Sequence, residues 1–371
     1  MLLRAQHCFL SLAAASEIRN TNRDEHPNRL RRFNWSTLKA LVLHGPGDAS
    51  IETIQVPVAV NGDILLKVQM VGLCGSDLNS FRGLNPLVSF PRIPGHEVCA
   101  TVVRGDSSLP EGTHVAVSPY TSCGKCASCS RGRPNACQFN QTLGVQRDGA
   151  LTEFIMAPRQ SLYPAKLTPK ELSLVEPLAV GFHAVARGRV SADDRVAIFG
   201  CGGVGLGAIA ASKARGAKTI CVDVDDEKLR LAQAAGGEYT INNLKESLHD
   251  RLLELTDGRG PDVVIEAIGK PTMFRAAVEE VAFTGRVVYI GYAKEPVSYE
   301  TRLFVQKELD ILGSRNGQPE DFHAVIRLLE QGVFPVNEVV SVVVPLEQAP
   351  NALRSWSESP SRFNKILVSI E

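Results

Sequence analysis

The stretch Arg195-Val-Ala-Ile-Phe-Gly200-Cys-Gly-Gly-Val-Gly205 decides the fold of this chain. Its apolar run predicts a buried strand, and the glycine-rich turn opens an alanine-rich segment to Arg215 that predicts a helix. Further apolar runs at 218–223, 262–267, 286–290 and 309–312 alternate with helix-like segments at 227–235 and 272–282. Strands and helices that alternate at this spacing predict a parallel, doubly wound α/β sheet.

The glycine-rich turn has the G-x-G-x-x-G spacing of a dinucleotide site, and the acidic Asp223 ends the next predicted strand. Gly200 permits a tight turn, Gly202 lets a pyrophosphate approach the backbone, and Gly205 allows close packing of helix and strand. A 2′-phosphate beside Asp223 would meet a like charge, so we predict NAD rather than NADP. The predicted cofactor-binding residues are Gly200, Gly202, Gly203, Val204, Gly205 and Asp223. The alternative is an incidental glycine-rich turn.

The chain on either side of this sheet has a different pattern. From Leu38 to Tyr163, short alternating runs are broken by Gly and Pro, which predicts an antiparallel, barrel-like β domain. After Gly313, the pattern predicts a helix over 319–331 and strands over 339–344 and 365–370.

Four of the nine cysteines have the spacing C-x2-C-x2-C-x7-C: Cys123, Cys126, Cys129 and Cys137. Four thiolates on one short loop suit tetrahedral zinc, and a closed four-sulfur site predicts a structural metal. A redox or disulfide loop and a zinc-ribbon nucleic-acid module are the alternatives. The second lacks a basic or aromatic platform elsewhere in the sequence.

The composition excludes some classes of protein. The chain has 371 residues, with 40 Lys and Arg against 40 Asp and Glu, so its formal net charge is zero. This balance argues against a protein that coats nucleic acid or an anionic membrane. No run of 18 apolar residues is present, so we predict no transmembrane helix.

Residues 1–37 differ from the rest and predict a disordered extension or a misplaced start. They faintly resemble a signal or transit peptide, but the apolar run is short and Glu17, Asp24 and Glu25 are atypical of a transit peptide. Zinc thiolates are unusual in an oxidising compartment, so we expect a cytoplasmic protein. Deletion of residues 1–37 should leave activity intact.

Two more segments carry metal-ligand side chains, namely Gly72-Leu-Cys74-Gly-Ser76-Asp77 and Pro94-Gly95-His96-Glu97. A Cys, a His and a carboxylate can bind zinc and leave one position for water or substrate. Glu176 is a further candidate oxygen ligand. Each residue alone is more often a core or surface group.

Taken together, these motifs and Glu176-Pro-Leu-Ala-Val-Gly-Phe-His resemble the zinc-dependent medium-chain alcohol dehydrogenase superfamily, in its polyol and sugar-acid branch. The resemblance covers about nine-tenths of the chain, from Lys39 onward. It implies a GroES-like catalytic domain over 38–184 and 315–371, and a Rossmann NAD-binding domain over 185–314. It also implies two Zn²⁺ per chain and a homodimer or homotetramer. The segment Gly313-Ser-Arg-Asn316 is similar to that of the hexonate 5-dehydrogenases.

The resemblance also implies roles for single residues. Cys74 and His96 match the catalytic zinc ligands, and Glu97 matches the carboxylate that ligates or sits beside the metal in the sorbitol branch. Glu176 stands where other branches place a second Cys ligand, and it would bind zinc directly or through water. Ser76 matches the hydroxyl that takes the substrate proton. Lys228, with Asp223, matches the adenosine-ribose contacts.

One residue departs from the family pattern, and the departure concerns the route by which the substrate proton leaves. Asn79 stands where several relatives have a His, and Asn cannot titrate near neutral pH. Proton release would then pass through water or ribose hydroxyls.

Arg315 and Asn316 follow the last predicted strand of the sheet and are expected to bind substrate, since Arg suits a carboxylate. Arg82 and Arg92 are weaker candidates, and an ion pair at Arg315 is the alternative.

The leading interpretation is a zinc- and NAD-dependent dehydrogenase that oxidises a secondary hydroxyl of a polyol or sugar acid. L-threonine 3-dehydrogenase, a simple alcohol dehydrogenase and a polyol-phosphate dehydrogenase are alternatives within the enzyme class. A non-catalytic nucleotide-binding scaffold is the alternative outside it, although a scaffold needs no open metal site.

Overall fold

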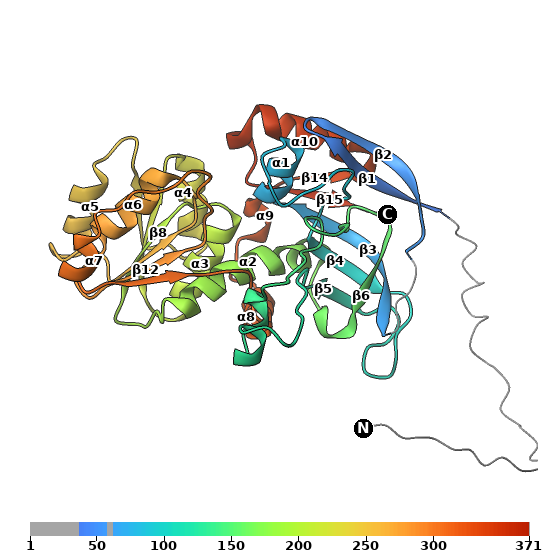
Figure 1. Cartoon of the computed structure of the whole chain (residues 1–371), viewed down its shortest axis with the longest axis horizontal. Helices are drawn as coiled ribbons and strands as arrows, with labels where there is room; N and C mark the ends of the chain where they lie inside the picture. The colour runs from blue at the N-terminus through green and yellow to red at the C-terminus, as the bar shows by residue number, and fades with distance from the viewer. Residues whose placement is uncertain (1–36, 58–61, 371) are drawn as a thin grey trace, which may run out of the picture. The chain divides into compact units, whose positions relative to one another are not determined.

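The structure is a computed structural model that describes residues 37–57 and 62–370 (Figure 1). The extension predicted over 1–37 lies outside the described residues except for Thr37, which begins the first strand. Within the described part, no helix is both long and apolar enough to span a bilayer.

One half of the fold is a six-stranded parallel sheet in the order β10-β9-β8-β11-β12-β13, and we call it, with its helices, the parallel-sheet lobe. Its strands are β8 (Arg195–Phe199), β9 (Lys218–Asp223), β10 (Tyr239–Asn242), β11 (Val263–Glu266), β12 (Arg286–Tyr289) and β13 (Asp310–Gly313). Its helices are α3 (Gly203–Ala214), α4 (Asp226–Ala234), α5 (Leu248–Leu255), α6 (Pro271–Glu280) and α7 (Arg302–Gln306) (Figure 1). All five strand pairs are parallel, which confirms the predicted doubly wound sheet.

The sequence prediction misses β10 and α5. β10 has only four residues, of which Ile241 and Asn242 are buried, and so it has no apolar run. α5 places Leu248, Leu252 and Leu255 on one face, but it has only eight residues and fully buries only Leu252, so it is too short to stand out in the sequence.

The other half contains a seven-stranded sheet in the order β14-β15-β3-β4-β5-β7, with β6 paired to β3. The strands are β3 (Asp63–Leu73), β4 (Glu97–Val102), β5 (His114–Val117), β6 (Phe154–Pro158), β7 (Leu162–Pro164), β14 (Val340–Pro345) and β15 (Lys365–Ser369). Its pairs are antiparallel, as predicted, except that β14 and β15 are parallel. A separate hairpin joins β1 (Thr37–Gly45) to β2 (Asp48–Gln55). We call these elements the metal lobe.

Helix α2 (Pro169–Arg187) connects the two lobes. Thr168 accepts from the backbone N–H of Glu171 and starts the helix with a capping box. Its glycine Gly181 packs so closely on α3 that an added Cβ would lie 2.3 Å from Ala208 N. The helix is therefore held against α3 of the parallel-sheet lobe by backbone contact.

The chain returns from the parallel-sheet lobe after β13, through residues 314–318. It then forms α8 (Pro319–Glu330), α9 (Val336–Val339) and α10 (Ala349–Glu358), besides β14 and β15. α1 (Gly75–Phe81) and the short 3-10 turns η2 (Cys129–Arg131), η3 (Pro134–Ala136), η4 (Arg159–Ser161), η5 (Leu346–Gln348) and η6 (Pro360–Arg362) complete the fold. Because β15 pairs with β3, the carboxyl-terminal segment forms part of the sheet that carries the first metal-ligand motif.

Candidate metal centres and dinucleotide site

The four cysteines of the loop between β5 and β6 converge on one point. Their sulfur atoms lie within 4.8 Å of one another, with Cys126 Sγ 3.5 Å from Cys129 Sγ and 3.8 Å from Cys137 Sγ. A disulfide would need about 2.05 Å. A zinc ion with bonds of about 2.3 Å to four sulfurs would hold neighbouring sulfurs about 3.8 Å apart. The spacing therefore suits a tetrahedral metal and no disulfide.

Backbone donors surround these sulfur atoms. The N–H groups of Cys126 and Phe139 donate to Cys123 Sγ and Cys137 Sγ, both at 3.3 Å. The Ser128 hydroxyl and backbone N–H groups lower the pKa of Cys126 to about 5, whereas burial raises that of Cys129 to about 11. A bound cation would favour the thiolate form of both. The loop fits the predicted structural zinc.

The second cluster combines Cys74, His96 and Glu97, whose ligand atoms lie within 4.8 Å of one another. Cys74 caps the amino end of α1, and Glu97 begins β4, which pairs with β3. In that pairing Gly72 stands opposite Glu97, and a Cβ on Gly72 would lie 2.0 Å from Glu97 Oε2. Glycine at position 72 is therefore required to make room for the carboxylate.

Asp77 ties the two ligand segments together. Its carboxylate accepts from Cys74 N at 2.9 Å and from Gly95 N at 3.1 Å, and it lies 3.7 Å from His96 Nδ1. Burial lowers the pKa of His96, but Asp77, Cys74 and Glu176 raise it by more. The sequence places Asp77 within the first ligand motif, but the spacing of the motif gave no sign of this bridging role.

Lys365 is a member of the site that the sequence analysis missed. Its Nζ lies 2.7 Å from both Glu97 oxygens and donates to Leu73 O at 3.2 Å. Lys365 is 4% exposed and Glu97 is fully buried. Burial lowers the pKa of Lys365, but the charges of Glu97, Cys74 and Glu176 raise it by more. The only signal in the sequence is a lysine that begins the apolar strand Lys365-Ile-Leu-Val.

Glu176 reaches the cluster from α2. Its Oε1 accepts a hydrogen bond from the hydroxyl of Tyr120, another residue that the sequence analysis missed. Burial raises the pKa of Glu176, and the charge of His96 opposes this shift. Glu176 is not among the three groups that share the 4.8 Å cluster, so its ligation of zinc stays a prediction.

The predicted proton acceptor lies beside the cluster. Ser76 Oγ is 3.5 Å from His96 Nε2, and Asn79 follows it by three residues on α1. Cys, His and carboxylate side chains with a hydroxyl alongside make a donor set that suits a zinc ion with one exchangeable position. The residues that would hold such an ion are Cys74, His96 and one of the two glutamates, Glu97 or Glu176.

The glycine-rich turn connects β8 to α3. Gly200 has φ +98°, which favours glycine, and a Cβ on Gly205 would lie 1.8 Å from Gly200 O. A Cβ on Gly202 would meet nothing within 4 Å. The space beside Gly202, at the amino end of α3, can therefore take a phosphate group.

Asp223 lies at the carboxyl end of β9. Its Oδ2 accepts from Cys201 N at 2.8 Å, and its Oδ1 accepts from Val224 N at 2.7 Å. Because a carboxylate offers about four acceptor positions, it can still accept from a ribose hydroxyl. Lys228 lies nearby in the first turn of α4, where its N–H donates to Asp225.

Arg315 and Asn316 lie against the four-cysteine loop. Arg315 Nη1 donates to Cys137 O at 3.3 Å, and Asn316 Nδ2 donates to Asn135 O at 2.9 Å. The hydrogen bonds of both side chains run to this loop, whereas the sequence analysis expected them in a substrate pocket. The weaker candidates are also engaged: Arg82 bonds to Ser357, and Arg92 pairs with Asp148.

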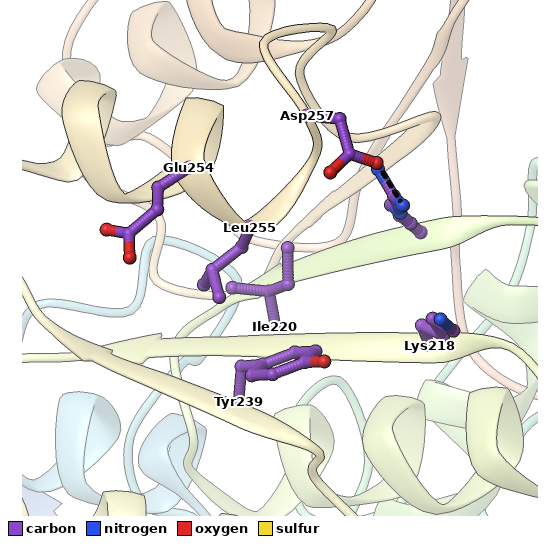
Figure 2. A pocket seen from close by; sticks show the side chains of 7 residues that line it. Lys218, Ile220, Tyr239, Glu254, Leu255 and Asp257 are labelled. Carbon is purple, nitrogen blue, oxygen red and sulfur yellow. Dashed lines mark hydrogen bonds and ion pairs between the residues drawn. The ribbon is translucent and has the colours of Figure 1, made fainter.

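A cavity of about 190 Å³ lies at the amino ends of β8, β9 and β10 (Figure 2). It is lined by Arg195, Lys218, Ile220, Tyr239, Glu254, Leu255 and Asp257. Arg195 pairs with Asp257 at 2.6 Å, and the two basic and two acidic groups balance in charge. The dinucleotide turn follows the carboxyl end of β8, so this cavity lies at the opposite edge of the sheet.

Two family models match the chain. Residues 60–167 match the model described as "Alcohol dehydrogenase GroES-like domain", and residues 203–331 match "Zinc-binding dehydrogenase". The first match confirms the predicted GroES-like fold of the metal lobe. The second covers the dinucleotide turn from Gly203 onward.

Curated relatives and solved structures agree with these models. The chain is 32% identical to sorbitol dehydrogenase of Bacillus subtilis, covering 89% of this chain and 97% of that protein. It is 31% identical to L-galactonate-5-dehydrogenase of Escherichia coli, covering 80% and 88%. An Escherichia coli CFT073 alcohol dehydrogenase complexed with NADH superposes with a TM-score of 0.83 at 28% identity, and a Sinorhizobium meliloti zinc-binding dehydrogenase bound to NADP does so with the same values. Each structural match covers 90% of this chain and 100% of the other.

Proposed function

Because the chain belongs to the zinc-dependent medium-chain alcohol dehydrogenase superfamily and is an oxidoreductase acting on alcohol groups, we propose that it oxidises a secondary hydroxyl of a polyol or sugar acid to a ketone. The observation that best supports this function is that Cys74, His96 and Glu97 converge, with Ser76 at the edge of the cluster. A scaffold that only binds a nucleotide has no use for this arrangement.

The residues of the metal cluster and its neighbours have separate roles in this reaction. Zinc bound by Cys74, His96 and Glu97 or Glu176 would act as a Lewis acid on the substrate hydroxyl, and NAD would take the hydride. Ser76 accepts the proton of the substrate hydroxyl and passes it outward. Since Asn79 cannot titrate, the proton then leaves through water or a ribose hydroxyl. Asp77 fixes the two ligand segments, and Lys365 balances the charge of Glu97.

The substrate class rests on the relatives. One acts on sorbitol, a neutral polyol, and the other on L-galactonate, a sugar acid. We favour a hexonate oxidised at carbon 5, because the segment Gly313–Asn316 is similar to that of hexonate 5-dehydrogenases. Arg315 gives this choice little support, since its guanidinium donates to the four-cysteine loop.

The test is NADH formation by zinc-replete enzyme with L-galactonate, L-gulonate, sorbitol, galactitol, threonine and simple alcohols. A kcat/KM at least tenfold higher for a hexonate than for any neutral polyol is the expected result. A preference for sorbitol would keep the mechanism and overturn the hexonate assignment. A preference for threonine or ethanol would overturn the polyol and sugar-acid class.

For the cofactor, we propose NAD over NADP, because Asp223 would repel a 2′-phosphate. Removing the charge in Asp223→Asn keeps an acceptor for Cys201 N–H. This variant should lower the NAD-to-NADP ratio of kcat/KM at least tenfold, as measured with both cofactors. An unchanged ratio would contradict the role of Asp223.

We further infer a cytoplasmic homodimer or homotetramer whose catalytic domain comprises 38–184 and 315–371, around a nucleotide domain at 185–314. Two zinc ions per chain are expected. The four thiolates favour a reducing compartment, and the formal net charge of zero gives no overall attraction to nucleic acid or an anionic membrane. Light scattering of the purified protein measures the oligomeric state, and a monomer would contradict this inference.

A further inference from the structure

Asn135 is the centre of a buried hydrogen-bond network outside the catalytic cluster. It lies in the four-cysteine loop and is 3% exposed. Its Nδ2 donates to Arg315 O at 2.7 Å and to His183 Nε2 at 2.9 Å, and its backbone carbonyl accepts from Asn316 Nδ2 at 2.9 Å. One residue of the loop thus bonds three residues that lie far from it in sequence.

The network continues to two helices that border both lobes. His183, on α2, bonds through Nδ1 to Asp321 Oδ2 at 2.9 Å, and the same oxygen accepts from Gln318 N at 2.8 Å to start α8. Both His183 and Asp321 are buried. Because Nδ1 donates to a carboxylate, Nε2 is free to accept from Asn135.

Residues 314–318 form the crossover by which the chain leaves β13 and returns to the metal lobe. Asn316 holds a positive φ of 57° there, which is uncommon for a residue other than glycine. A Cβ on the next residue, Gly317, would lie 3.2 Å from both Ala179 Cβ and Phe322 Cε2. The crossover is therefore bent and tightly packed, and Arg315 and Asn316 bond it to the four-cysteine loop.

The crossover also leads toward the catalytic cluster. Phe322, the residue after Asp321, makes an edge-to-face contact with Tyr120 at a centroid distance of 6.5 Å. Tyr120 in turn donates to Glu176. A displacement of α8 would therefore be transmitted through Tyr120 to Glu176, a candidate metal-site residue.

We propose that Asn135 is a positioning residue that fastens the crossover at 314–318 to the four-cysteine loop. The loop then does more than stabilise itself: it fixes where the parallel-sheet lobe, with its dinucleotide turn, is joined to the metal lobe. Arg315 and Asn316 act as the other half of this fastening and not as substrate ligands. Hydride transfer depends on the reacting atoms being about 3–3.5 Å apart, so a loose crossover should slow turnover.

Three variants of the full chain test this proposal. Asn135→Leu removes the central donor and keeps the branching of the side chain. Asn316→Gly removes one bond to Asn135 while allowing the positive φ, so it adds no backbone strain. The matched control is Asn140→Leu, since Asn140 is a buried residue of the same loop whose side chain bonds only within that region, to Thr121 N and Thr142 Oγ1.

The first measurement is peptide-resolved hydrogen–deuterium exchange of the zinc-replete protein. Asn135→Leu and Asn316→Gly should speed exchange over residues 313–322 at least tenfold, and Asn140→Leu should leave that segment unchanged. The proposal is overturned if the segment exchanges at the wild-type rate in Asn316→Gly, or equally fast in Asn140→Leu. Asn316→Gly decides the matter if Asn135→Leu fails to fold.

The second measurement rests on the proposed function. With a substrate in hand, Asn316→Gly should lower kcat at least fivefold and leave the KM for NAD within twofold of wild type, because the dinucleotide turn itself is untouched. An unchanged kcat would overturn the positioning role. The hydrogen–deuterium exchange experiment needs no substrate, so it still tests the fastening of the crossover if the proposed function is wrong.

Discussion

At the scale of single residues, the ion pair between Glu97 and Lys365 controls the charge of the metal cluster. A buried carboxylate beside a thiolate and a second carboxylate is costly without a cation nearby. Lys365 supplies one positive charge at 2.7 Å from both oxygens. It therefore provides a cationic partner for the Glu97 side chain in a position where the metal can reach it.

Replacing this lysine tests the pair. Lys365→Met should destabilise the protein by about 3–5 kcal/mol, because Glu97 is left as an uncompensated buried charge. The double variant Glu97→Gln/Lys365→Met should recover most of that loss. Denaturant unfolding measures both free energies. Equal destabilisation in the single and double variants would show that the lysine matters only through packing.

Glu266 is another buried carboxyl, at the end of β11. Burial raises its pKa, although the backbone N–H groups of Gly269 and Ile268 oppose the shift. A carboxyl with a raised pKa in the folded protein contributes stability at low pH, and that contribution is lost as pH rises through the folded pKa. Glu266→Gln should therefore gain stability relative to wild type between pH 5 and pH 8, on the order of 1 kcal/mol. Thermal unfolding across this range checks the sign, and a gain that shrinks with pH would contradict it.

Single residues also mark the limit of what the sequence could predict. Cys74, His96 and Glu97 could be found because metal ligands occur in short motifs with recognisable neighbours. Lys365 and Tyr120 could not, because each reaches the cluster through strand pairing or helix packing between distant segments. A lysine at the start of an apolar strand is expected on the surface, unless its partner, here Glu97, is known.

At the scale of elements, the turn between β8 and α3 is the feature on which cofactor binding depends. Gly205 and Gly202 have different reasons to be glycine. The first has backbone 1.8 Å from where a Cβ would stand, and the second has open space. Substitution by alanine separates the two roles.

Gly205→Ala should lower both stability, by about 1–3 kcal/mol, and NADH affinity, at least tenfold, because α3 must move away from Gly200. Gly202→Ala should lower NADH affinity alone, because its methyl group fills space meant for the pyrophosphate. Fluorescence titration with NADH and thermal unfolding measure the two properties. Normal NADH affinity in Gly202→Ala would place the dinucleotide elsewhere.

The strands of the parallel sheet were largely predictable, because β8, β9 and β11 are apolar on both faces and end at glycine or acidic residues. β10 and α5 were not, because a strand of four residues and a helix of eight residues are too short to stand out in the sequence. The parallel pairing of β14 with β15 was also missed, since alternation does not reveal strand direction.

At the scale of the whole molecule, the chain crosses between the lobes twice, through α2 and through residues 314–318. The sequence predicted two domain types and their order. It did not predict that Arg315 and Asn316 bond to the four-cysteine loop, because that contact joins segments about 180 residues apart. When only the order of elements is known, a segment that follows a strand at the edge of the sheet is expected to contact substrate.

We propose that the Cys74–His96–Glu97 cluster holds the catalytic zinc of an NAD-linked dehydrogenase. The most direct test is NADH formation by His96→Ala, with zinc content and NADH affinity determined on the same sample. We predict two zinc ions in the wild-type chain and one in the variant, turnover reduced at least a thousandfold, and NADH affinity within about twofold of wild type. Near-normal turnover by His96→Ala, or loss of zinc from the four-cysteine loop instead, would contradict the account.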